Sequence, residues 1–239
     1  MSLSYGQIKP VDIEIVRDAF GVPHIYGKTD ADTAYGLAWA HSEDDFMTIQ
    51  KAYLAGNQLL SSYLANNGII VDFLTQFIES KKTVDELFST LSDDFIKILE
   101  AYSQGINRYA ELHPEEVLVK NLFPITPKKM LNYSFLQLFI SNGADQLVSK
   151  IISNNTVDLS NLGINDDIQG SNTFAFNNNK TKNGETYLAI NTHQPLDGPN
   201  SWYEVHLNSE EGTNILGATF AGAPCILTGV NEHLAWTHT

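Results

Sequence analysis

A glycine–serine pair stands where a polar segment of the chain changes into an alternating apolar one. The stretch DIQGSNTFAF, residues 167–176, contains Gly170 and Ser171 at this junction. A serine in such a place is ordinarily a turn residue that precedes a strand. Its hydroxyl becomes a nucleophile only where a nearby base accepts its proton. The pair therefore raises two interpretations, a turn or a reactive serine, and spacing alone favours the turn.

The histidines are the other residues whose side chains could do chemistry. Four of the seven lie in the last third of the chain: His193, His206, His233 and His238. They form no H-E-x-x-H pattern, so packed or surface histidines are the plainer interpretation, and a His-based metal protein stays open as an alternative. Cys225 is the only cysteine, which excludes an intrachain disulfide and a Cys-rich metal site. The chain also lacks the G-x-S-x-G elbow of α/β-hydrolases.

Composition and charge limit the partners. The 239 residues suffice for one large domain or two ordinary ones, and the net charge is −14. An acidic chain is a poor ligand for nucleic acid or for an anionic membrane surface, because both attract Lys/Arg-rich faces. No apolar run approaches the roughly 18 residues of a membrane span. The opening MSLSYGQIKP has neither a charged n-region nor an apolar h-region, so we expect no signal peptide in this chain.

The elements that must position these residues are helical first and β-rich later. Alternation around Val11, Ile13 and Ile15, followed by a Gly-Val-Pro turn, predicts a strand pair over 11–27. Apolar residues at three- and four-residue steps predict helices over 29–64, 83–114 and 126–155, with Thr29 or Asp30 capping the first. The polar, aperiodic segment 154–170 is typical of an exposed loop.

Short strands separated by turns follow Ser171. They are NTFAFNN, TYLAINTH, WYEVHL, NILGATF, CILTGV and LAWTHT. Strands at roughly ten-residue spacing indicate an antiparallel sheet. The sequence thus predicts an α+β protein in which a helical part precedes a β part.

Three separated blocks of the sequence resemble the penicillin-amidase family, the acylases with an N-terminal serine nucleophile. The blocks are RDAFGVPHIYGKTDADTAYGLAWAHSEDDFMTIQ, GSNTFAF with NGETYLAINTHQPLDGPNSWYEVHL, and GATFAGAPCILTGVNEHLAWTHT. The resemblance implies part of an Ntn-hydrolase (αββα) fold. It assigns residues 1–153 to an α-subunit, 154–170 to a spacer and 171–239 to the start of a β-subunit.

The resemblance also implies roles for the site residues. Family members cut themselves before the catalytic serine, which here places autocleavage between Gly170 and Ser171. The freed α-amine of Ser171 would then act as the base for its own hydroxyl. His193, in NTHQP, matches the histidine that orients this amine in the homoserine-lactone, aculeacin and cephalosporin acylases. The implied reaction is hydrolysis of an N-acyl amide, such as an acyl-homoserine lactone or a penicillin.

The family pattern includes parts that lie beyond Thr239. Its oxyanion hole uses a backbone N–H directly after the WTHT stretch and an asparagine far downstream, so we expect this chain alone to be uncleaved and inactive. The remainder of the β-subunit is the implied partner, and self-association through open strand edges is expected without it. No cofactor is expected in this chain, although a structural calcium is implied for the full-length enzyme, which would be periplasmic or secreted. The alternative is a short, non-catalytic paralogue that acts as a binding or assembly module.

Overall fold

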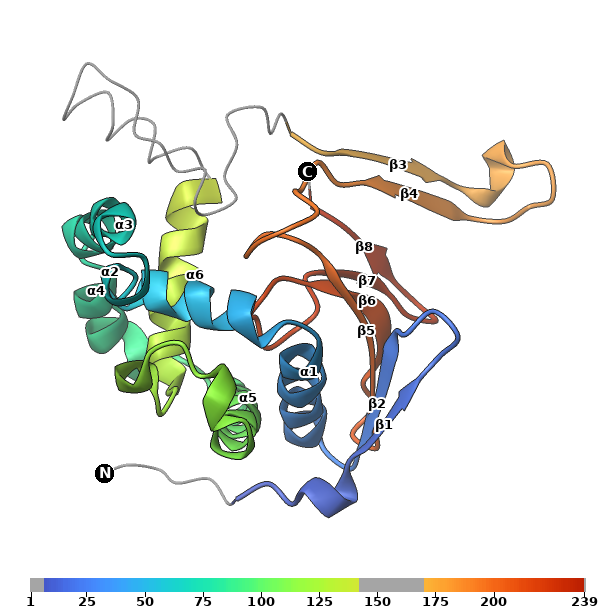
Figure 1. Ribbon diagram of the computed structural model, residues 1–239. Coiled ribbons are helices and arrows are strands. Elements are labelled where there is room, and N and C mark those ends of the chain that lie inside the picture. The colour runs from blue at the N-terminus through green and yellow to red at the C-terminus, as the bar shows by residue number, and fades with distance from the viewer. Residues whose placement is uncertain (1–6, 142–169, 239) are drawn as a thin grey trace.

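Helices cover one face of a six-stranded sheet in the computed structural model, which describes residues 7–141 and 170–238 (Figure 1). The arrangement confirms the predicted α+β class. The sheet order is β1-β2-β5-β6-β7-β8, with strands Glu14–Arg17, Pro23–Gly27, Tyr203–Ser209, Asn214–Thr219, Thr228–Val230 and Ala235–Trp236. Strands β3 (Asn172–Phe176) and β4 (Tyr187–Asn191) form a separate antiparallel hairpin.

The six-stranded sheet joins the two ends of the chain. Strands β1 and β2 form the predicted antiparallel pair, and strands β5 to β8 pair antiparallel with one another as predicted. The contact between β2 and β5 is parallel, so the sheet as a whole is mixed rather than antiparallel. Parallel neighbours need a long crossover connection. The helices that lie between β2 and β5 in the chain are part of that connection. Sequence periodicity could not reveal that β2 and β5 are parallel neighbours.

Helix α1, Asp30–Gly56, is the central helix of the layer. Thr29 caps it: its side chain accepts a hydrogen bond from the backbone N–H of Asp32, whose carboxylate accepts one from the N–H of Thr29. The helix is kinked at Asp45, where φ and ψ are −155° and 62°. It ends well before residue 64, the predicted end, because Gln58 adopts a φ of +59° in the left-handed region.

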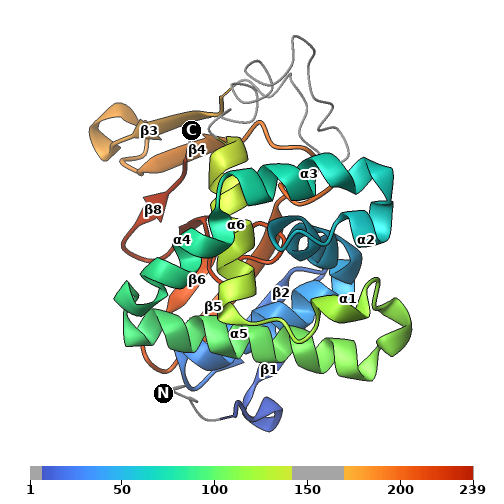
Figure 2. The same ribbon diagram turned by 90° about the vertical axis from the view of Figure 1, so that its left-hand side faces the viewer.

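The other helices lie on the side of α1 away from the sheet, as Figure 2 shows from the helical side. They are α2 (Ser61–Leu64), α3 (Asn66–Phe77), α4 (Ser80–Leu87), α5 (Asp93–Leu112) and α6 (Pro127–Ser141). Short 3-10 turns lie at Pro10–Asp12, Phe88–Thr90, Pro114–Glu116, Lys120–Leu122 and Asn178–Lys180. The sequence patterns do not predict α3. Within the described ranges, no helix is long and apolar enough to cross a membrane.

The single helix predicted over 83–114 is two helices in the structure. Ser92 has an extended backbone, with a ψ of 148°, and its hydroxyl accepts a hydrogen bond from the N–H of Phe95 at 3.3 Å. A serine that caps the next helix in this way competes with continuation of the previous one. The predicted extension of the third helix to residue 155, and all of the predicted spacer except Gly170, lie outside the described residues.

The core lies between α1 and the sheet and between α1 and the neighbouring helices. Ile25 of β2 and Val205 of β5 are fully buried on the helix-facing side of the sheet. Tyr53 of α1 is also fully buried, and its hydroxyl donates a hydrogen bond to the carbonyl oxygen of Gly222 at 2.7 Å. The helical and β-rich parts of the sequence therefore share one core.

Candidate active site

The register of the β3–β4 hairpin brings Ser171 and His193 together. Asn172 pairs with Asn191 at the open end of the hairpin, so Ser171 and His193 lie just beyond this pair on opposite strands. The Oγ atom of Ser171 accepts a hydrogen bond from the backbone N–H of His193 at 3.2 Å. Two predicted site residues that are 22 positions apart are thus in direct contact. Antiparallel pairing is the physical cause, because it folds the later strand back onto the earlier one.

The imidazole of His193 contacts the asparagine pair. Its Nε2 atom lies 3.2 Å from Nδ2 of Asn172 and 3.3 Å from Nδ2 of Asn191. A carboxamide nitrogen is a donor only, so Nε2 accepts from both and a neutral ring carries its hydrogen on Nδ1. Sequence reasoning missed both asparagines. The available signal was their position: Asn172 follows Ser171 directly in GSNTF, and Asn191 stands two residues before His193 in INTHQ.

The surroundings of Ser171 are open on the side of Gly170. Gly170 is exposed, and a Cβ atom added to it would meet no atom within 4 Å. Ser171 and His193 are each half-buried. With the Gly170–Ser171 bond intact, the nitrogen of Ser171 is a peptide nitrogen and cannot serve as a base. The contact between the two residues runs through the main chain of His193, and the role of its ring towards a free α-amine stays a prediction.

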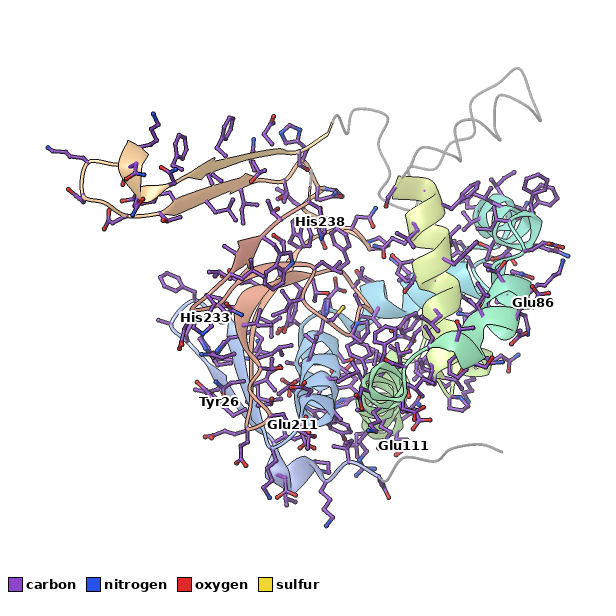
Figure 3. The ribbon with its side chains drawn as sticks, turned by 180° about the vertical axis from the view of Figure 1, so that it is seen from behind. Tyr26, Glu86, Glu111, Glu211, His233 and His238 are labelled. Carbon is purple, nitrogen blue, oxygen red and sulfur yellow. The ribbon has the colours of Figure 1, made fainter. Side chains whose placement is uncertain are left out.

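The remaining histidines of the β-rich part are not gathered around Ser171 into one metal centre. His206 contacts His24 on the six-stranded sheet, with 3.0 Å between their Nδ1 atoms. His233 is exposed and lies far from His238, which Figure 3 shows near the base of the hairpin. In the described part of the chain, one group of three or more metal-ligating side chains occurs, formed by residues of the segment HPEE: His113, Glu115 and Glu116.

This group does not fit the calcium that the family resemblance implies. It offers one imidazole and two exposed carboxylates within 4.8 Å of one another. Calcium takes six to eight oxygen ligands, and imidazole suits transition metals instead. We therefore assign no calcium ion to the HPEE group.

The geometry defines an α+β protein with a glycine–serine bond at the start of a hairpin strand and a histidine on the facing strand. The penicillin amidase family model matches residues 12–239, and the chain belongs to this family. The match covers both parts of the shared sheet as well as the hairpin.

The similar proteins are acylases. An acyl-homoserine lactone acylase PvdQ from Pseudomonas fluorescens is 24% identical over all of this chain and 35% of its own length. A PvdQ from Pseudomonas syringae is 24% identical over 95% of this chain, and a QuiP acylase from Pseudomonas fluorescens is 21% identical over 95%. The chain spans about a third of the length of these relatives.

A solved structure of a thermostable penicillin G acylase from Alcaligenes faecalis also matches. It is 18% identical, with a TM-score of 0.46, and the match covers 58% of this chain and 83% of that one.

Proposed function

We propose that this chain is the N-terminal part of an N-acyl amide hydrolase that is made as a precursor and cuts itself between Gly170 and Ser171. The observation that carries the proposal is the position of Ser171 within a chain of the penicillin amidase family. It follows an exposed glycine, directly precedes strand β3, and receives a hydrogen bond from the backbone N–H of His193 at its Oγ atom.

Self-cleavage would proceed by transfer of the acyl group of Gly170 from the backbone nitrogen of Ser171 to its Oγ atom. Oγ of Ser171 attacks the carbonyl carbon of Gly170, and the hydroxyl proton passes to the departing nitrogen. The C–N bond breaks, leaving an ester to Oγ and a free α-amine on Ser171. Water then hydrolyses the ester and leaves a carboxylate on Gly170. Glycine suits this position because it has no Cβ to obstruct the approaching hydroxyl.

The freed serine supplies both groups that amide hydrolysis needs. An α-amine typically has a pKa of about 7.7–8.0, so a useful fraction is neutral near pH 7 and can accept the hydroxyl proton. Oγ then attacks the amide carbonyl of the substrate, the amine leaves, and water hydrolyses the acyl-enzyme. The names of the relatives support an N-acyl substrate such as an acyl-homoserine lactone, with penicillins as the alternative. By family resemblance we place the enzyme in the periplasm or outside the cell.

The same proposal holds that the 239-residue chain alone keeps the Gly170–Ser171 bond. Attack on an amide needs fixed donors aimed at the developing oxyanion in a site that excludes water. Here every residue of β3 is exposed, and Gly170 is exposed beside it. The remainder of a β-subunit is the partner that would enclose this hairpin.

Intact-mass measurement and N-terminal sequencing test the proposal. The chain is expressed alone and together with any sequence that continues it in the genomic reading frame. We expect a new N-terminus at Ser171 in the longer protein and a single uncut chain for the 239 residues. In the longer protein, Ser171→Ala should prevent cleavage. Thr173→Ala, which removes a hydroxyl on the same strand, should leave cleavage unchanged.

Cleavage that persists in Ser171→Ala, or a new N-terminus elsewhere, would contradict this mechanism. The processed protein should release the acyl group from acyl-homoserine lactones or phenylacetyl amides. A processed protein that releases neither would leave autocleavage standing but refute this assignment of substrate class. A reading frame that stops after Thr239 would instead favour the non-catalytic module.

A further inference from the structure

Two histidines face each other across neighbouring strands on the side of the sheet away from the helices. His24 of β2 and His206 of β5 are register partners in the parallel pair. Their Nδ1 atoms are 3.0 Å apart, and their ring planes meet edge to face with centroids 5.0 Å apart. Figure 3 shows the adjacent Tyr26 pointing away from the helical layer, and its ring contacts that of His206 edge-on. The pair therefore lies on a face that solvent can reach.

The far nitrogen of each ring faces an oxygen. Nε2 of His206 lies 2.8 Å from Oδ1 of Asn214, and Nε2 of His24 lies 3.7 Å from a carboxylate oxygen of Asp18. Oxygen acceptors at these positions favour a hydrogen on each Nε2. In that state both Nδ1 atoms carry lone pairs, and these lone pairs point at each other. The gap between them therefore accommodates one positive species, either a proton or a metal ion.

We propose that His24 and His206 form a binding site for a divalent transition-metal ion of the Zn²⁺ class, held by the two Nδ1 atoms. Zinc–nitrogen bonds of about 2.0–2.1 Å in tetrahedral geometry place two ligating nitrogens about 3.3 Å apart. The observed 3.0 Å therefore needs only a small opening of the pair. The side chain of His24 is 29% exposed, so an ion can reach the pair from solvent. Water would fill the remaining coordination positions of the ion.

The outer contacts of the pair match those of metal-binding histidines. Such histidines usually donate the hydrogen of their second nitrogen to a carboxylate, a carbonyl oxygen or water, and this donation fixes the tautomer and the ring orientation. Asp18 and Asn214 supply a carboxylate and an amide oxygen here. Asp18 is itself held by hydrogen bonds from two backbone N–H groups of its turn. Glu204, an exposed residue two positions before His206, adds negative charge on the same face of β5.

Zinc titration of the 239-residue chain by calorimetry tests the site. We expect one bound ion, with affinity reduced at least about tenfold in both His24→Gln and His206→Gln. His233→Gln removes an exposed histidine elsewhere in the β-rich part and should leave the affinity unchanged. His113→Gln removes the imidazole of the HPEE group and should also leave it unchanged. Circular dichroism of each variant checks that it is folded.

The wild-type chain gives a second readout that depends on no variant. Copper(II) added at one equivalent should show hyperfine coupling to two imidazole nitrogens by electron paramagnetic resonance. Coupling to one nitrogen, or loss of zinc binding in His113→Gln with binding kept in His24→Gln, would place the ion at the HPEE group and overturn the proposal. Absence of zinc binding would overturn it too, leaving the two histidines as a hydrogen-bonded pair.

Discussion

At the scale of single residues, the chemistry of Ser171 depends on whether the bond before it is intact. Its Oγ atom already accepts a hydrogen bond from His193, and the glycine before it is open to solvent. In the proposed mechanism, the base exists only after cleavage, because a peptide nitrogen carries no available lone pair. The side chain of His193 is meanwhile positioned by Asn172 and Asn191. The hairpin thus holds Ser171 and His193 together while the Gly170–Ser171 bond is intact.

His41 is a second residue whose chemistry is set by its surroundings. It lies in α1, is buried, and its ring stacks on that of Tyr203 with centroids 3.9 Å apart. Its Nδ1 atom has no hydrogen-bond partner among the described residues. Burial lowers the pKa of His41 to about 4, although the charges of Asp45 and Asp44 act in the opposite direction. The folded protein therefore favours the neutral form of the His41 imidazole.

This burial predicts a loss of stability in acid. In the folded state the pKa of His41 is about 4, below the 6.5 of an unperturbed histidine, so the unfolded chain binds the proton more readily. The stability that the folded protein gains from a neutral His41 is fully present above about pH 6.5 and is lost as the pH falls towards 4. Between pH 7 and 4, His41 should lower the free energy of unfolding by about 3 kcal/mol.

Urea unfolding at several pH values measures this effect. His41→Phe keeps an aromatic ring against Tyr203 and removes the titrating group. The difference between wild type and variant should therefore change with pH between about 7 and 4, because the carboxylates shared by both proteins cancel. A pH-independent difference would show that His41 does not titrate in this way.

At the scale of elements, α1 links the two parts of the sequence. Arg17 of β1 binds Asp44 of α1 at 2.9 Å, and the hydroxyl of Tyr203 in β5 donates to the same carboxylate at 2.6 Å. Burial, followed by the Asp44 contact, raises the pKa of Tyr203, so the phenol stays protonated and keeps donating. The kink of α1 at Asp45 follows directly after this contact. One helix therefore joins strands from both ends of the chain.

The contact of α1 with α6 depends on Gly56. A Cβ atom at this position would overlap the backbone of Tyr133 in α6. We expect Gly56→Ala to lower the free energy of unfolding by about 2 kcal/mol, because overpacking a closed contact costs about 1–3 kcal/mol. Gly170→Ala places the same methyl group in open space and should change the stability of the 239-residue chain by less than about 0.5 kcal/mol. Equal effects of the two changes in urea unfolding would show that the α1–α6 contact can relax.

At the scale of the whole molecule, the β3–β4 hairpin projects from the body of the protein (Figure 1). Phe174 is 59% exposed, Phe176 47% and Tyr187 50%, and the three lie on one face of the hairpin. A two-stranded hairpin is marginal in water unless it packs against other elements. Exposed aromatic side chains on a strand with open edges are a surface for pairing with another chain.

We expect the 239-residue chain to self-associate through this hairpin. Sedimentation velocity at low and high protein concentration should show larger species at high concentration. The double change Phe174→Ser with Phe176→Ser should shift the distribution to monomer. Phe20→Ser is the matched control, because Phe20 is an exposed aromatic residue in the β1–β2 turn. Association that persists in the double variant, or that Phe20→Ser abolishes, would place the interface elsewhere.

The sequence by itself determined the local elements and singled out Ser171 as the candidate nucleophile. The cap at Thr29, the first strand pair and the strands after Ser171 follow from caps, alternation and turn residues, which act between near neighbours. The blocks that resemble the penicillin amidase family marked Gly170 and Ser171 as candidate site residues, and the same resemblance, at NTHQP, marked His193.

Only the tertiary structure decided which distant residues meet. The parallel contact of β2 with β5, the asparagine pair around His193 and the facing histidines His24 and His206 depend on strand register. The break before α5 depends on Ser92, which has an extended backbone and caps α5 instead of continuing a single helix from α4. Strand register and the path of the crossover connection are set by packing across the whole core. The periodicity of the sequence shows only which face of each helix or strand is apolar, so it does not reveal which elements pair.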